Sequence, residues 1–475
     1  MSRSARLAPV AALLSLALAL TACDSGSGGG SGGDSARPGA PGVRDPYFPR
    51  AGNGGYDVSH YGLTLSYDPA TTRLTGTAVI TARATQALSA FDLDLAGLDV
   101  AGVTVEGRPA RTSRDGQELT VRPQDELTAG ETFEVTVRYS GRPRTLTDPD
   151  GSEEGWLPTA DGALALGEPT GSMAWFPGNH HPSDKATYDL AVTVPEGLTA
   201  VSNGELTERR ESGGRTVFTW HTGEPMAGYL ATLAIGRYRV SESTTEDGLP
   251  VYTAVDPEVD EASRDVLGRL PEVVDWATEN FGPYPFSSTG AIVDRPGDAG
   301  YALETQNRPV FPGPPTVELL VHELAHQWYG DSVSPESWRD MWLNEGFATY
   351  AEWLWEEDHG GDDAEEIFTE LYEHGRHGDE VFEDLWDFPP AEPPTASDIS
   401  GEPVYQRGAM VLHRIRRTVG DDAFYDLVQG WAAEHRHGNA GTDDFTAYVE
   451  KAFQDEDFTS LWEDWLYGEG KPDRP

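Results

Sequence analysis

The segment His322-Glu323-Leu324-Ala325-His326 decides how the rest of the chain is interpreted. Residues i and i+4 of an α-helix share a face, so His322 and His326 would direct two imidazoles at one metal ion, with Glu323 on the same side. Catalytic zinc sites use three protein ligands and leave the fourth position open to water. Glu345, further along the chain, is a suitable third ligand. The pattern predicts one Zn2+ ion bound by His322, His326 and Glu345.

Apolar residues around this motif recur at helical spacing, namely Val317, Leu320, Val321, Leu324 and Trp328. Pro314 precedes this stretch and Gly330 follows it, where helix start and stop signals belong. A second helix would carry Glu345 and end before Gly360. We therefore expect two antiparallel helices that face one ion.

The N-terminal residues resemble an export signal. A basic start over residues 1–6 precedes an apolar run over residues 7–20, which is too short to span a bilayer as an ordinary helix. The run ends in Leu-Thr-Ala-Cys, which resembles the bacterial lipobox, and Cys23 is the only cysteine. We predict a signal peptide over 1–22, a lipid on Cys23 and a Gly/Ser/Pro-rich tether over 23–44. The protein would then be exported and anchored by its lipid to the outer face of the cell membrane.

The net charge of −46 and the pI near 4.4 argue against a nucleic-acid partner. A well-solvated surface on an exported protein explains this charge, and attraction of cationic peptides is the alternative. We expect the membrane to be contacted through the N-terminal lipid only.

The two halves of the remaining chain differ in hydrophobic period. Apolar residues alternate from Tyr61 onward, which predicts an antiparallel β domain, a sandwich or saddle, over residues 45–245. Helical patterning begins near Glu261, where Pro271 divides or starts a helix, and predicts a mainly α-helical domain over 246–475. The predicted fold class is a multidomain β plus α/β protein. Adjacent His180 and His181 point apart on a strand and have no suitably spaced partner, so we do not expect a second metal site there.

A set of motifs in a fixed order makes the chain similar to a known family. These motifs are Y-A-L-E-T-Q at 301–306, H-E-L-A-H-Q-W-Y-G-D at 322–331, W-L-N-E-G-F-A-T-Y at 342–350 and V-Y-Q-R-G-A at 404–409. Together they resemble the gluzincin aminopeptidases, typified by aminopeptidase N and leukotriene hydrolase. The similarity covers nearly the whole chain after the tether and implies a thermolysin-like catalytic domain.

The resemblance implies a role for individual residues. His322, His326 and Glu345 would be the zinc ligands, and Glu323 the general base. Tyr405 would donate a hydrogen bond to the developing oxyanion. Glu304, at the glutamate position of the family's G-A-M-E-N motif, and Glu168, from the β domain, would bind the free α-amino group of a peptide. Thr349, one helical turn after Glu345, is a candidate for orienting a ligand.

The chain also departs from the family pattern. Tyr301, Leu303 and Thr305 replace the usual Gly, Met and Asn around Glu304. The sequence ends soon after Trp465 without the large helical C-terminal domain of many relatives, so we expect a more open cleft. The sequence favours a zinc aminopeptidase acting on peptides with a free N-terminus. The alternatives are a zinc endopeptidase with relaxed N-terminal recognition and a catalytically silent, zinc-containing protein that binds peptides.

Overall fold

The computed structural model describes residues 35–378 and 380–474. The predicted signal peptide, Cys23 and the first part of the tether lie outside these residues. Within the described residues, no helix combines the length and the apolar character needed to cross a membrane. The sections below concern the unit that begins at Ala36.

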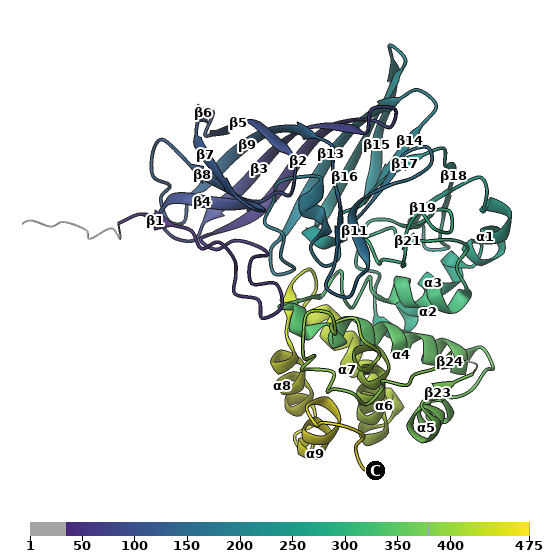
Figure 1. Ribbon diagram of the computed structural model, residues 1–475. Coiled ribbons are helices and arrows are strands. Elements are labelled where there is room, and N and C mark those ends of the chain that lie inside the picture. Colours follow the sequence, from purple (N-terminus) through teal and green to yellow (C-terminus); the bar gives the residue numbers. More distant parts are fainter. Residues whose placement is uncertain (1–34, 379, 475) are drawn as a thin grey trace, which may run out of the picture. The chain divides into compact units, whose positions relative to one another are not determined.

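The alternating apolar runs of the first half form strands, as predicted. Side chains of β2 (Tyr56–Asp68) alternate between buried and more exposed, and Leu63, Leu65 and Tyr67 are almost fully buried. The strand belongs to an eight-stranded sheet of order β15-β16-β13-β2-β3-β9-β5-β6 (Figure 1). Its other strands are β3 (Arg73–Ala84), β5 (Asp99–Val105), β6 (Arg108–Pro109), β9 (Thr132–Gly141), β13 (Lys185–Pro195), β15 (Glu205–Ser212) and β16 (Arg215–Ala227).

Two smaller sheets accompany the large one. The first has the order β1-β4-β8-β7 and contains β1 (Arg37–Pro38), β4 (Leu88–Asp94), β7 (Arg111–Asp115) and β8 (Glu118–Arg122). The second has the order β10-β11-β12-β17-β14 and contains β10 (Thr145–Thr147), β11 (Glu153–Pro158), β12 (Ala163–Leu166), β14 (Thr199–Ser202) and β17 (Leu233–Gly236). Short helical turns η1 (Gly171–Ala174) and η2 (Gly228–Leu230) lie between these strands in sequence.

The prediction of a wholly antiparallel β domain is wrong for two strand pairs. Strand β13 pairs with β2 in parallel, and so does β1 with β4. Parallel neighbours need a long connection. The chain between β3 and β13 supplies one, because it contributes strands to all three sheets before it returns beside β2. Period-two alternation fixes which side chains are buried, but it carries no information on strand direction.

A four-stranded sheet and most of the helices form the second half. The sheet has the order β18-β19-β20-β21, with β18 (Arg239–Thr244), β19 (Pro250–Val255), β20 (Thr289–Val293) and β21 (Val310–Phe311). Strand β18 precedes residue 245 and pairs with β19 after it, so this sheet crosses the expected domain boundary. The helices are α1 (Asp260–Leu267), α2 (Leu270–Phe281), α3 (Val317–Ala325), α4 (Trp342–Asp358), α5 (Ala364–His374), α6 (Gly408–Val419), α7 (Asp421–Glu434), α8 (Thr442–Ala452) and α9 (Thr459–Leu461).

Short elements complete this half. They are η3 (Trp338–Asp340), the π-helical turns η4 (Pro403–Arg407) and η5 (Trp462–Leu466), and the two-residue strands β22 (Ser334–Pro335), β23 (Arg376–His377), β24 (Glu380–Val381) and β25 (Asn439–Ala440). Pro271 lies in the first turn of α2, so it starts a helix and does not divide one. Figure 1 shows α4 between α3 and α6, and it packs against both.

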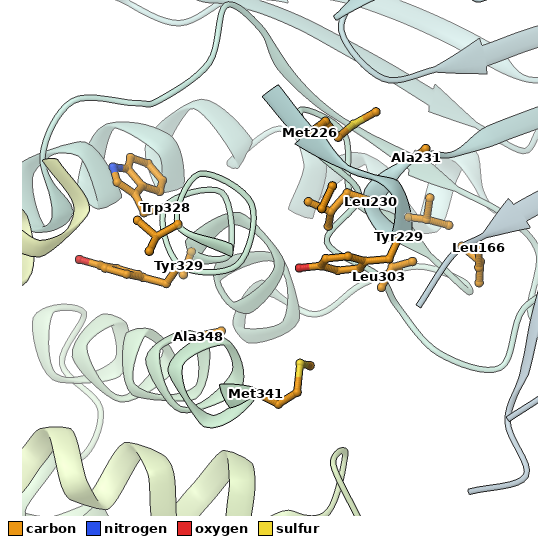
Figure 2. Packing of buried hydrophobic residues seen from close by; sticks show 14 of the residues in the cluster. Leu166, Met226, Tyr229, Leu230, Ala231, Leu303, Trp328, Tyr329, Met341 and Ala348 are labelled. Carbon is orange, nitrogen blue, oxygen red and sulfur yellow. The ribbon is translucent and has the colours of Figure 1, made fainter. Parts of the chain in front are cut away.

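The two halves share one hydrophobic core. Buried apolar side chains form a single cluster that extends from Phe48 to Leu466. Figure 2 shows part of it, with Tyr229 and Leu230 of the first half beside Leu303 of the second. The Tyr229 hydroxyl also donates a hydrogen bond to the carbonyl oxygen of Gly330 at 3.2 Å.

A buried lysine adds polar contacts between the halves. The Lys185 ammonium donates to the carbonyl oxygens of Asp331, Ser332 and Gly438 at 2.8, 3.0 and 3.1 Å. Burial lowers the pKa of Lys185 to about 7. Three carbonyls around one ammonium satisfy all its donors, which fixes this part of the β domain against the helical half.

Candidate metal centre and substrate cavity

Helix α3 presents the first two metal-ligand candidates. The Thr316 side chain caps its start by accepting a hydrogen bond from the Leu319 amide at 3.2 Å. Leu320 and Leu324 are fully buried and hold the helix in the core. The helix ends at Ala325, so Trp328 lies beyond it and not on its predicted stripe. His326 caps the C-terminus, where its side chain still faces the same ion position as His322.

Helix α4 supplies the third candidate from its first turn. It begins at Trp342, carries Glu345, and ends at Asp358, two residues before Gly360. Helices α3 and α4 pack against each other. The predicted pair of helices facing one point is therefore present.

The three candidate side chains converge. The Nε2 atoms of His322 and His326 lie 3.2 and 3.4 Å from Oε2 of Glu345. In a tetrahedral zinc site with bonds of about 2.05 Å, ligand atoms are about 3.3 Å apart. All three residues are buried, and their ligand atoms lie within 4.8 Å of one another. The donor set therefore fits a single zinc ion.

The second ring nitrogen of each histidine has its own partner. Nδ1 of His322 lies 2.5 Å from Oε1 of Glu352, and Nδ1 of His326 lies 3.1 Å from the carbonyl oxygen of Tyr329. Such partners orient the ring and reserve Nε2 for the metal. Sequence reasoning suggested Thr349 for this role, but Nδ1 of His322 donates its hydrogen bond to the carboxylate of Glu352. The sequence did contain a signal for Glu352 that was not used. Its spacing from Glu345 places it two helical turns further on, on the same face of α4.

Glu323 lies beside the three candidate metal ligands, and no other role is evident for its carboxylate. It is buried, and its Oε2 has no hydrogen-bond partner among the described residues. Burial raises the pKa of Glu323 to about 8. A carboxylate in this state is suited to take up a proton from a neighbouring water near neutral pH.

Tyr405 reaches the same place from a different element. It lies in η4, directly before α6, and its ring is nearly parallel to that of His322, with centroids 6.1 Å apart. A close crossing of α4 and α6 makes this approach possible. A Cβ added to Gly346 would lie 2.9 Å from the carbonyl carbon of Gly408, so neither position accepts a side chain without a shift. Burial raises the pKa of Tyr405 well above its usual range, which keeps the phenol protonated as a donor.

Glu304 is fixed by both its backbone and its side chain. The Gln327 amide donates to its carbonyl oxygen at 3.0 Å, and the Asn344 amide donates to its carboxylate at 3.4 Å. Leu303 bridges to Val310 in an antiparallel pair. These contacts hold Glu304 close to the metal centre despite the altered residues around it, with its carboxylate within 4.8 Å of His326.

Glu168 follows β12 and comes from the β domain. The Tyr301 hydroxyl donates to its carbonyl oxygen at 3.2 Å. Glu154 stabilises the turn that follows Glu168, because its carboxylate accepts hydrogen bonds from the amide and hydroxyl of Thr170 at 3.0 and 2.9 Å. Sequence reasoning missed Glu154, since an acid inside a strand gives no distinct signal.

The carboxylates of Glu168 and Glu304 influence each other. Oε1 of Glu168 is buried and has no partner among the described residues. Burial, and then the charge of Glu304, raise the pKa of Glu168 well above its usual range, and burial raises that of Glu304. Two buried carboxylates in this state provide a favourable place for a cation.

These residues line one cavity of about 350 Å3 between the β domain and helices α3 and α4. It is lined by every metal, catalytic and substrate-binding candidate of the sequence, namely Glu168, Glu304, His322, Glu323, His326, Glu345 and Tyr405. The adjacent histidines of the β domain are elsewhere. His180 bonds to the Phe176 carbonyl oxygen at 3.0 Å, and His181 to Ser183 at 2.7 Å.

Comparison with known proteins agrees with this geometry. A profile described as the Peptidase M1 N-terminal domain matches residues 57–230, and one described as the Peptidase family M1 domain matches residues 304–465. The crystal structure of an M1 zinc metallopeptidase from Deinococcus radiodurans is 29% identical, with a TM-score of 0.82. That similarity covers 91% of this chain and 98% of the other.

Curated proteins give the same result over part of their length. Aminopeptidase M1 of Arabidopsis thaliana is 26% identical over 338 residues, which cover 65% of this chain and 37% of that protein. Aminopeptidase N of Streptomyces lividans is 28% identical over 303 residues, which cover 58% and 34%. The chain thus spans little more than a third of the length of these relatives. The fold and the metal set are those of a two-domain zinc metallopeptidase. The chain belongs to peptidase family M1.

Proposed function

We propose that this protein is a zinc aminopeptidase that removes N-terminal residues from peptides. The observation that carries the proposal is the buried pair Glu168 and Glu304 beside the His322-His326-Glu345 set. An α-ammonium between two carboxylates forms charge-assisted hydrogen bonds, which measure the substrate from its N-terminus. Solved relatives carry a Tyr-Ser-Ala substrate or L-arginine, and these ligands of other proteins support peptides as substrates here.

Each residue of the site has its own role in the proposed reaction. A zinc ion bound by the three ligands would acidify a water molecule and polarise the scissile carbonyl. Glu323 takes the proton from the attacking water and returns it to the leaving amine. The Tyr405 phenol donates a hydrogen bond to the oxygen that becomes negative in the transition state. Glu168 and Glu304 hold the ammonium so that the first peptide bond lies at the reacting centre.

A peptide panel tests this proposal. Fluorogenic peptides with a free N-terminus are compared with their N-acetylated counterparts, with and without a zinc chelator. We expect hydrolysis of the free peptides alone, and loss of this hydrolysis with chelator. Glu304→Gln removes one charged partner of the ammonium and should lower kcat/KM for free peptides by about 30- to 10³-fold.

Two other outcomes would contradict the proposal. Equal internal cleavage of free and acetylated peptides, slowed alike by Glu304→Gln, would identify an endopeptidase. If the zinc-loaded protein hydrolyses neither set of peptides but binds them, it is the catalytically silent peptide-binding protein of the alternative.

We also propose that the protein is exported and held by a lipid on Cys23 to the outer face of the cell membrane. The support is the basic and apolar order of residues 1–20, followed by Leu-Thr-Ala-Cys. Cys23→Ser should move the protein from the membrane fraction to the soluble fraction without loss of specific activity. A Cys23→Ser variant that stays in the membrane fraction would refute the anchor.

A further inference from the structure

The loop that joins β10 to β11 brings two acidic residues to the cavity. Asp148 and Asp150 both line it, yet their surroundings differ. Asp150 is exposed, and its Oδ1 accepts a hydrogen bond from the Ser152 amide at 2.8 Å. Asp148 is buried, and the loop is closed by its amide, which donates to the Ser152 carbonyl oxygen at 2.9 Å. Asp150 thus stabilises the turn, while the carboxylate of Asp148 is left for the cavity.

The described part of the chain places no positive charge beside Asp148. Among the described residues, neither a hydrogen-bond donor nor a basic side chain contacts its carboxylate, and no lysine or arginine lines the cavity. Burial, and then the charge of Asp150, raise the pKa of Asp148 to about 7. A buried carboxylate without a partner costs free energy when it is ionised, and either a proton or a bound cation removes this cost.

The other acidic residues of the cavity already have tasks. Glu345 belongs to the metal set, Glu352 orients His322, and Glu323 lies beside the attacking water. Glu168 and Glu304 hold the ammonium in the proposed function. Asp148 is the buried carboxylate of this cavity to which neither the metal nor the proposed reaction assigns a role.

The position of the ammonium determines where the first side chain of a substrate goes. The Cα of the first residue is one bond from the ammonium, so its side chain starts beside the pair Glu168 and Glu304. The Tyr301 hydroxyl donates a hydrogen bond to the carbonyl oxygen of Glu168, and the loop that carries Asp148 lies at the same end of the β10-β11-β12 sheet as Glu168. Tyr301 and Asp148 therefore form the wall next to Glu168. The metal set and Tyr405 occupy the α3 and α4 side, where the scissile carbonyl must lie.

We propose that Asp148 selects peptides whose first residue is lysine or arginine. Its carboxylate binds the positive end of that side chain, and the Tyr301 ring packs along the aliphatic stem. This inference rests on the proposed aminopeptidase function and names its substrate class. Asp148 determines specificity and takes no part in bond cleavage.

The test is the ratio of kcat/KM for arginyl and leucyl aminocoumarin substrates, with the lysyl substrate as a second cation. Wild type should favour the two cationic substrates over the leucyl substrate by at least about 10-fold. Asp148→Asn keeps the shape and removes the charge, so the ratio should fall by about 10- to 100-fold. Asp150→Asn is the matched control from the same loop and should change the ratio by less than about 3-fold.

The same ratio has a pH signature. Ionisation of Asp148 with a pKa of about 7 should raise the arginyl-to-leucyl ratio of wild type between pH 6 and pH 8. Asp150, Glu154, Glu168 and Tyr301 are the other titratable groups near Asp148. Glu168 binds the α-ammonium of both substrates in the same way. Its titration therefore affects both kcat/KM values alike and cancels in their ratio. Asp148→Asn should flatten this rise.

Two results would overturn the inference. They are a wild type that prefers the leucyl substrate and an Asp148→Asn variant with an unchanged ratio, whether or not both substrates are slowed. If no free-amino substrate is hydrolysed, the proposed function fails on its own. Calorimetric titration of zinc-loaded wild type and Asp148→Asn with L-arginine and L-norleucine then decides. At least 10-fold tighter binding of arginine that Asp148→Asn removes supports the inference, and equal binding overturns it.

Discussion

The two walls of the cavity are built in different ways. One wall comes from α3, α4 and η4, and it carries the metal ligands, Glu323 and Tyr405. The other comes from the β domain and the segment around Tyr301, and it carries Glu168, Glu304 and Asp148. The helical wall holds groups that would act on any peptide bond, while the β-domain wall holds groups that would recognise one end of the substrate. Reaction and selection can therefore be separated by mutation.

The largest effect is expected on the helical wall. Glu323→Gln should lower kcat by about 10²- to 10⁴-fold for every substrate, because the proton acceptor is lost. Its zinc content should stay near one ion per chain, since the three ligands are intact. Steady-state kinetics and elemental analysis of the purified variant measure both. Near-normal turnover would refute the assignment of the general base.

A substitution on the opposite wall should discriminate between substrates. Glu168→Gln should reduce kcat/KM for peptides with a free N-terminus by about 10- to 100-fold, because one partner of the ammonium becomes neutral. N-acetylated peptides have no ammonium, so their slow hydrolysis is the internal reference. An equal loss for both sets would mean that Glu168 serves the fold of this wall and not recognition.

Glu352 tests how the helical wall is held together. Glu352→Gln should weaken zinc binding by about 10- to 100-fold, because the hydrogen bond that orients His322 loses its charge. Competition with a chelator of known affinity measures this change. Thr349→Ala, from the same helix, is the control and should alter zinc affinity by less than about 3-fold. Equal effects of the two substitutions would contradict the role of Glu352.

A buried acid away from the cavity should affect stability and leave catalysis unchanged. Oδ2 of Asp94 accepts hydrogen bonds from the amides of Gly52 and His180, both at 3.0 Å. Burial raises the pKa of Asp94 from 3.8 to about 7, so the folded protein binds this proton more tightly than the unfolded chain. Its stabilising contribution is complete below about pH 4 and is lost as the pH rises to about 7.

Asp94→Asn stays neutral and keeps an oxygen acceptor. Its free energy of unfolding relative to wild type should therefore rise by about 2 to 3 kcal/mol between pH 5 and pH 8. Urea unfolding at the two pH values measures this difference, with the exposed Asp115→Asn as the control. A difference that does not vary with pH would show that Asp94 is ionised in the folded protein.

Local patterns in the sequence determined the elements and the metal set. Helical spacing placed His322 and His326 on one face, and alternation in β2 identified the buried side chains, because both depend only on backbone period. Period two says nothing about the direction of the partner strand, which is why the parallel pair of β13 and β2 was not predicted. The end of α3 at Ala325 was also missed, since apolar spacing continues to Trp328 although the helix does not.

The tertiary structure alone decided which further residues support the site that the motifs had indicated. Glu352 becomes a hydrogen-bond partner of His322 only because α3 packs against α4. Asp148 and Glu154 are unremarkable acids in the sequence, and they acquire their surroundings when β10, β11 and the segment after β12 come together. Such contacts join residues far apart in the chain, so they follow from how the two halves pack and not from any local period.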